Sequence, residues 1–119
     1  MAVIYEKLGR PEDAIKTFDK VLDIKSHVFS PTHLSVAATL KNRGYTQSSS
    51  GKLLDALISY DMAVKIEQAT FNNYHESIAE TLATISIILS KLNRQDEANA
   101  AYQASVHVQQ SLEARRKIH

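Results

Sequence analysis

The chain contains no cysteine and no tryptophan, and it has only two prolines and three glycines among 119 residues. The lack of cysteine excludes disulfides and thiolate metal sites and fits a reducing compartment. So few glycines and prolines argue against a β-sandwich or barrel, which needs many turns. No apolar run approaches the roughly 20 residues that cross a bilayer, and no signal-peptide pattern is visible. We therefore expect a cytoplasmic protein with no membrane contact.

Neither sign of charge dominates the sequence. Fourteen basic residues stand against thirteen acidic ones, so the formal net charge is +1. Proteins that bind nucleic acid usually concentrate positive charge, so we expect no nucleic-acid partner. The short basic run Arg115-Arg116-Lys117 is more typical of a solvated helix C-terminus than of a nucleic-acid or membrane patch.

The sequence repeats itself with a period of 42 residues and without gaps. One set of positions recurs three times: Gly9, Ala14, Phe18 and Leu22; Gly51, Ala56, Tyr60 and Val64; Asn93, Ala98, Tyr102 and Val106. A second set recurs twice: Phe29, His33, Ser35, Ala37, Thr39 and Leu40; Phe71, His75, Ser77, Ala79, Thr81 and Leu82. A fixed period in this range indicates stacked structural repeats.

The spacing of apolar residues predicts helices over residues 11–28, 31–48 and 53–69, then from just after Asn73 to about 92, and from about 96 to 117. Ser30 and Asn73 are predicted as N-caps of two of these helices. The fold class is therefore all-α, with antiparallel helix pairs that must stack to bury their apolar faces.

Small residues recur where paired helices must approach each other closely. Gly44 and Ser86 occupy equivalent places in the first helix of a pair, and Ala14, Ala56 and Ala98 do so in the second. The aromatic residues Phe18, Tyr60 and Tyr102 follow four positions later on the same face, where we expect them to fill the gap.

The run Gly-x-x-x-x-Ala-x-x-x-aromatic at Gly9 and again at Gly51 resembles the tetratricopeptide repeat. Because the period exceeds the usual 34 or so residues, and because residues 28–33 read Val-Phe-Ser-Pro-Thr-His, the chain is most similar to the kinesin light chain-like subgroup. The resemblance implies one domain over residues 1–119. It would hold a partial first repeat (1–27), a second repeat (31–69) and a third (73–117). Because no polar capping helix is visible at either end, we expect a fragment of a longer array, with a genuine short protein as the alternative.

Three possible sites of chemistry are better explained by structure. Ser49-Ser50-Gly51-Lys52 lacks the other residues of a phosphate loop and is predicted as an interhelical turn. His33 and His75 lie one full repeat apart, so they serve a local purpose near a helix start rather than bind a metal. No nucleophile, base and orienting group can be assembled from the sequence. We expect no cofactor, no metal and no enzymatic activity.

The resemblance implies a concave groove, lined by the first helix of each pair, that binds an extended peptide or a helix of a protein partner. Asn42 matches an asparagine that the family often uses to hold a ligand backbone, whereas Thr84 stands at the next such place. Mapping the face by repeat gives Ala38, Lys41, Asn42, Tyr45, Ser48, Glu80, Ala83, Thr84, Ile87 and Ser90. The chain is thus expected to be a non-catalytic interaction scaffold. The alternatives are a purely structural segment of a longer solenoid and an accessory domain of an enzyme.

The exposed ends of a short solenoid also suggest a homodimer. Met1, Ile4 and Leu8 at the start have no complete helix pair beside them, and the last helix has no following repeat to cover it. An apolar stripe is predicted on that last helix from Ala104, Val108, Leu112 and Ile118. Identical patches of this kind can cover each other across a two-fold axis.

Overall fold

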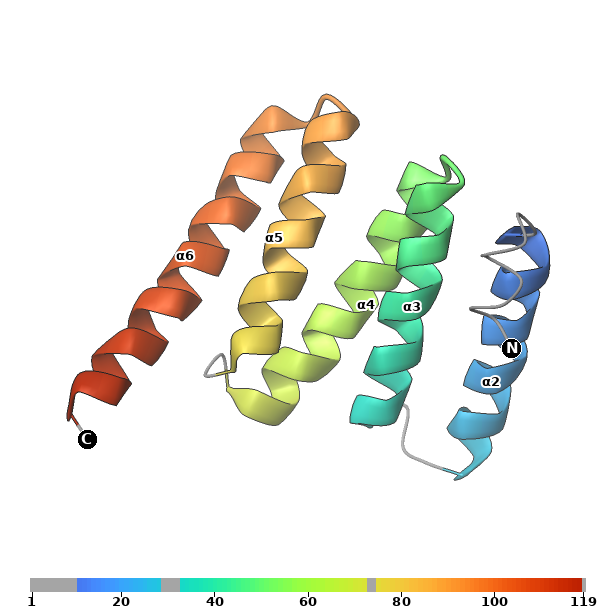
Figure 1. The fold of residues 1–119 in the computed structure, drawn as a ribbon, viewed down its shortest axis with the longest axis horizontal. Coiled ribbons are helices and arrows are strands. Elements are labelled where there is room, and N and C mark those ends of the chain that lie inside the picture. The colour runs from blue at the N-terminus through green and yellow to red at the C-terminus, as the bar shows by residue number, and fades with distance from the viewer. Residues whose placement is uncertain (1–10, 29–32, 73–74, 119) are drawn as a thin grey trace.

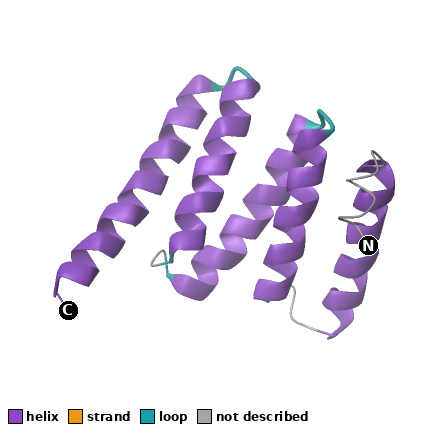
Figure 2. Ribbon diagram, viewed as in Figure 1, coloured by secondary structure: helices purple, strands orange, loops and turns teal. Residues whose placement is uncertain are grey.

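The computed structural model describes residues 11–28, 33–72 and 75–118, and in these ranges the chain forms five helices and no strand. They are α2 (Pro11–Val28), α3 (Leu34–Ser49), α4 (Leu53–Phe71), α5 (Glu76–Lys91) and α6 (Gln95–Ile118). Figure 1 shows them side by side in chain order, each antiparallel to the one before, and Figure 2 shows the short loops that join α3 to α4 and α5 to α6. The all-α prediction is confirmed, although α4 continues two residues beyond its expected end at Ala69.

The turns within the two complete helix pairs have the same backbone geometry, as the 42-residue period requires. Gly51 and Asn93 are equivalent by repeat, and both adopt positive φ angles, of 84° and 61°. The Lys52 N–H donates to the Gln47 carbonyl at 2.8 Å, and the Arg94 N–H donates to the Leu89 carbonyl at 2.9 Å. Glycine and asparagine tolerate the left-handed conformation better than other residues, so they occupy this one position.

Histidine side chains cap the first helix of each complete pair. Nδ1 of His33 accepts the Ser35 N–H at 2.9 Å, and Nδ1 of His75 accepts the Ser77 N–H at 3.1 Å. The N-caps are therefore His33 and His75 instead of Ser30 and Asn73, which lie outside the described residues. Serine and asparagine are the usual cap residues, but a neutral imidazole nitrogen can also accept the hydrogen bond of a helix N-terminus.

Replacing His75 tests this cap. We expect His75→Ala to lower the free energy of unfolding by about 1 kcal/mol, because it removes the acceptor for Ser77 N–H. The substitution also removes the ring that stacks on Phe71 at a centroid distance of 4.1 Å. Urea denaturation followed by circular dichroism measures the change. His75→Asn, which restores a capping acceptor, should recover most of the loss; equal stability of the Ala variant and the parent would contradict the assignment.

The small residues lie at the helix contacts, as predicted. Ala14, Ala56 and Ala98 are buried, and so is Gly44. A Cβ atom at Gly44 would come within 2.8 Å of the Tyr60 ring, so only glycine leaves room for that side chain in its present position. The α5–α6 pair shows the equivalent close approach, since the Ser86 hydroxyl donates to the Ala98 carbonyl at 2.9 Å.

The three repeated aromatic residues were predicted to fill the space between helices, and two of the three are buried as expected. Phe18 and Tyr60 are buried, but Tyr102 is 59% exposed. Both Phe18 and Tyr60 lie on a helix that is followed by another helix pair. α6 is the last helix in the described part of the chain, so no further pair covers Tyr102. The same residue position is therefore core or surface according to its place in the stack.

Candidate functional site

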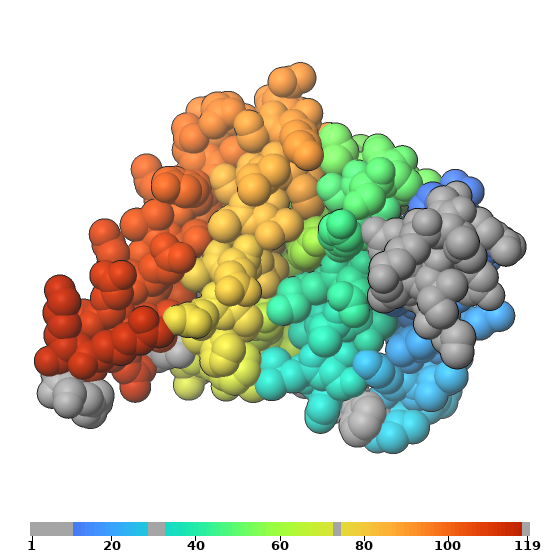
Figure 3. All heavy atoms as spheres, viewed as in Figure 1, coloured from blue at the N-terminus to red at the C-terminus, as the bar shows by residue number. Residues whose placement is uncertain are grey.

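A hollow of about 370 Å³ lies between α3 and α5, on the face that Figure 3 views. α3 contributes Lys41, Asn42 and Tyr45, and α5 contributes Glu80 and Thr84, all of them on the groove face predicted from the sequence. Two residues that the prediction did not include, Tyr60 of α4 and Thr81 of α5, complete the lining.

The exposed side chains of the hollow offer mixed chemistry. Tyr45 is a largely exposed aromatic ring, and Asn42 and Glu80 are also exposed. An asparagine amide both donates and accepts hydrogen bonds, which is what an extended peptide backbone requires. The Thr84 hydroxyl is already engaged, since it donates to the Glu80 carbonyl at 3.0 Å within α5.

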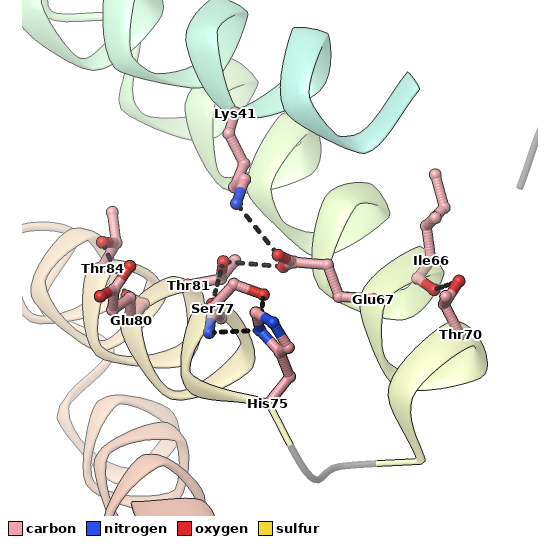
Figure 4. Close-up of polar contacts among 9 residues, drawn as sticks. All are labelled: Lys41, Ile66, Glu67, Thr70, His75, Ser77, Glu80, Thr81 and Thr84. Atoms are coloured by element: carbon pink, nitrogen blue, oxygen red, sulfur yellow. Dashed lines mark hydrogen bonds and ion pairs between the residues drawn. The ribbon is translucent and has the colours of Figure 1, made fainter. Parts of the chain in front are cut away.

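The positive charge of Lys41 in the hollow is compensated by a buried carboxylate of α4. Nζ of Lys41 lies 3.0 Å from Oε2 of Glu67, a residue of α4 whose side chain is 3% exposed. Oε1 of Glu67 accepts a hydrogen bond from the Thr81 hydroxyl at 2.8 Å, as Figure 4 shows. A carboxylate this deeply buried needs such partners. Because Lys41 neutralises Glu67, the exposed carboxylate of Glu80 gives the hollow its remaining charge.

The preceding repeat has the same arrangement with the charge reversed. Lys25 is equivalent to Glu67, and its Nζ bonds the Thr39 hydroxyl at 2.8 Å and the Ser35 carbonyl at 3.1 Å. Thr39 is in turn equivalent to Thr81. In both repeats a long charged side chain near the end of one pair reaches the first helix of the next, and this fixes how successive pairs stack.

The other predicted groove residues do not line this hollow. Ala38 and Ile87 are exposed, and Ser48 and Ala83 are partly buried. Ser90 is exposed near the end of α5, where its hydroxyl donates to the Gln95 side chain at 3.2 Å. Thr81 was missed because its place in the repeat marks it as core. It lies one turn before Thr84, which is the only signal in the sequence that could have included it.

The apolar stripe predicted for the last helix is wrong in its main members. Val108 is buried and Leu112 is partly buried, and both pack against the core cluster that α5 contributes to. Ala104 is exposed, and the side chain of Ile118 lies outside the described residues, as do Met1, Ile4 and Leu8. The helical spacing was correct, but the face that it defines points toward α5 instead of solvent.

The described ranges hold no group of three or more His, Asp and Glu side chains placed to bind a metal ion. Within the same ranges, no helix is long and apolar enough to cross a membrane. Of the segment Ser49-Ser50-Gly51-Lys52, Ser49 ends α3 and the other three residues form the turn to α4; Nζ of Lys52 lies 3.8 Å from a Glu12 carboxylate oxygen.

Comparison with known proteins places this helical repeat in a family. Residues 1–66 match the model of the tetratricopeptide repeat, so the chain belongs to the tetratricopeptide repeat family. No curated protein sequence matches the chain.

Two solved structures of kinesin light chain-like, nearly identical repeats from Podospora anserina, one of them a single-substitution variant, share the fold. Their TM-scores are 0.78 and 0.80, at 18% sequence identity in both cases. Each match covers 91% of this chain and 51% of the solved chain, so the chain spans about half the length of those proteins. Tetratricopeptide repeats generally mediate protein–protein interactions and are generally non-catalytic.

Proposed function

We propose that the chain is a non-catalytic scaffold that binds an extended peptide segment of a protein partner across the hollow between α3 and α5. The observation that carries this proposal is the meeting of Asn42 and Tyr45 from one repeat with Glu80 and Thr84 from the next in one hollow. Asn42 would bond the backbone of the peptide, and Tyr45 would contact an apolar part of it.

The charges of the hollow restrict the partner. The ammonium of Lys41 is held by Glu67, so it is a poor donor for a carboxylate of the ligand. Glu80 is exposed at the rim and also borders a second hollow, of about 360 Å³, that contains Glu76, Glu113 and Arg116. The proposed peptide is therefore neutral or basic at this point, because an acidic residue would meet Glu80 without a free cation beside it.

A peptide-display selection against the intact chain tests the proposal. We expect selected peptides to lose at least about tenfold in affinity for the variant that combines Asn42→Ala and Tyr45→Ala, since both substitutions remove direct contacts. Fluorescence anisotropy measures the affinity, and circular dichroism checks that the variant remains folded.

α6 supplies a matched control. Asn99 and Tyr102 have the same residue types and spacing as Asn42 and Tyr45, and both are exposed away from the hollow. Asn99→Ala combined with Tyr102→Ala should leave peptide affinity unchanged. Equal loss in both double variants, or in neither, would favour the alternative that the chain is a purely structural segment of a longer solenoid.

The other two possibilities have weaker support. An accessory role in an enzyme would be favoured by a converging polar cluster with an unpaired group. The buried cluster of Lys41, Glu67 and Thr81 is instead satisfied internally. Self-association through the ends of the array loses its main argument, because Val108 and Leu112 are turned toward α5.

A further inference from the structure

α4 carries a row of exposed apolar side chains along one of its faces. Leu54, Ile58 and Met62 recur every four residues, and they are 60%, 58% and 48% exposed. Beside Ile58 and Met62 lies a hollow of about 340 Å³ whose lining includes Leu57, Ile85 and Leu89. The apolar surface therefore extends from α4 toward α5.

The 42-residue repeat does not by itself require apolar residues at the positions of Leu54, Ile58 and Met62. The equivalent positions on the neighbouring outer helices hold charged or small residues: Glu12, Lys16 and Lys20 on α2, and Asp96, Ala100 and Ala104 on α6. At these three repeat positions, α2 and α6 carry charged or small residues, whereas α4 carries large apolar ones. Exposed apolar side chains that gather in this way mark an interaction surface.

Charged residues flank Ile58 and Met62 in a symmetrical order. Asp55 lies three residues before Ile58, Met62 lies four residues after Ile58, and Lys65 lies three residues after Met62. The spacing of three, four and three reads the same in both directions, and all four residues are exposed on one helix face. A helix face with this order is complementary to a second copy of itself that runs antiparallel.

We propose that α4 is a homodimerisation surface, on which two copies of the chain pack α4 against α4 in antiparallel orientation about a two-fold axis that passes midway between Ile58 and Met62. Ile58 of each copy then meets Met62 of the other, and Asp55 of each meets Lys65 of the other. The contact is isologous, so each pair forms twice.

The charges around the row are compatible with this packing. Nζ of Lys65 lies 2.9 Å from Oδ2 of Asp61 in its own helix, but the Lys65 side chain is 71% exposed, unlike that of Lys41, so its other N–H donors can bond Asp55 of the second copy. At the rim of the hollow, Arg94 pairs with Glu97, whose hydrogen bond and charge raise the pKa of the guanidinium. These paired charges leave no strong field that would repel an identical surface.

Sedimentation equilibrium over a wide concentration range tests the proposal. We expect the parent chain to form a concentration-dependent dimer and Ile58→Glu to remain monomeric. Lys65→Asp and Asp55→Lys, each alone, should raise the dimer dissociation constant about tenfold, since like charges replace two attractive contacts. The variant with both reversals restores the pairing and should associate within about threefold of the parent.

Two controls separate this surface from other effects. Ile24→Glu changes an equally exposed apolar residue of α2 and should leave association unchanged. The variant with Asn42→Ala and Tyr45→Ala should also dimerise normally, because the peptide hollow lies elsewhere. A parent chain that is monomeric at every concentration, or an Ile58→Glu variant that dimerises like the parent, would overturn the proposal.

Discussion

Replacing Lys41 by methionine should destabilise the fold by about 2–4 kcal/mol, the largest effect that we expect from a single substitution in the chain. Methionine keeps most of the length and apolar contact of the lysine stem but removes the ammonium that neutralises Glu67. The carboxylate of Glu67 would then be left in the interior with the Thr81 hydroxyl as its remaining described partner. Chemical denaturation at neutral pH measures the loss.

Substituting the two members of this ion pair should lower the stability by unequal amounts. Glu67→Gln should cost less than Lys41→Met, because a glutamine oxygen can still accept from Thr81 and Lys41, whose side chain is 32% exposed, can turn to solvent. Lys52→Met is the surface control. Its exposed pair with Glu12 has an N···O distance of 3.8 Å, so its loss should change stability by less than about 1 kcal/mol. Equal losses in Lys41→Met and Lys52→Met would mean that water reaches Glu67 freely.

The sequence predicted those features that depend on the backbone and on side-chain size. Gly51 lies in the segment predicted as an interhelical turn, and both Gly51 and its repeat equivalent Asn93 adopt the left-handed conformation that few other residues tolerate. Ala14, Ala56 and Ala98 were assigned to helix contacts because a small residue recurred at one place in each repeat, and all three are buried. The repeat makes such constraints visible in the sequence, because each copy packs its helices in the same way and needs the same kind of residue at the same position.

The features that the sequence did not predict depend on what lies next to a residue in space. Glu67 and Lys25 are equivalent in the repeat, and each contacts a threonine of the next pair. Because their charges are opposite, comparing the repeats in the sequence does not show that the two residues make the same kind of contact. Tyr102 follows the pattern of Tyr60 but is exposed, since no helix follows α6 among the described residues. Val108 and Leu112 show the limit of helical spacing, which defines a face without saying which neighbour covers it.

For the peptide hollow, the sequence predicted the helix faces but could not predict the pairing across repeats. Lys41, Asn42 and Tyr45 share one face of α3, and Glu80 and Thr84 share one face of α5, as expected from their spacing. That these five residues border one hollow depends on the distance between α3 and α5. Glu67, bonded to both helices from α4, helps to set that distance. The binding role of the hollow remains a prediction.

Ala56→Leu should lower the free energy of unfolding by about 1–3 kcal/mol, because a larger side chain must be placed where α4 has no free space. Ala56 is fully buried in the main core cluster, beside Tyr60 and Val64. Its equivalent Ala98 shows how closely the paired helices approach, since its carbonyl accepts the Ser86 hydroxyl at 2.9 Å. Leucine favours a helix almost as strongly as alanine does, so a loss of stability reports packing instead of helix propensity.

The same substitution at Ala69 separates packing from every other effect of leucine. Ala69 lies on the same helix but is exposed, so Ala69→Leu should change the unfolding free energy by no more than about 0.5 kcal/mol. Parallel urea titrations of both variants and the parent, followed by circular dichroism at about 222 nm, give the comparison. A midpoint for Ala56→Leu that matches that of Ala69→Leu would show that Ala56 does not lie at a close helix contact. The equivalence of Ala14, Ala56 and Ala98 as helix contacts would then fail as well.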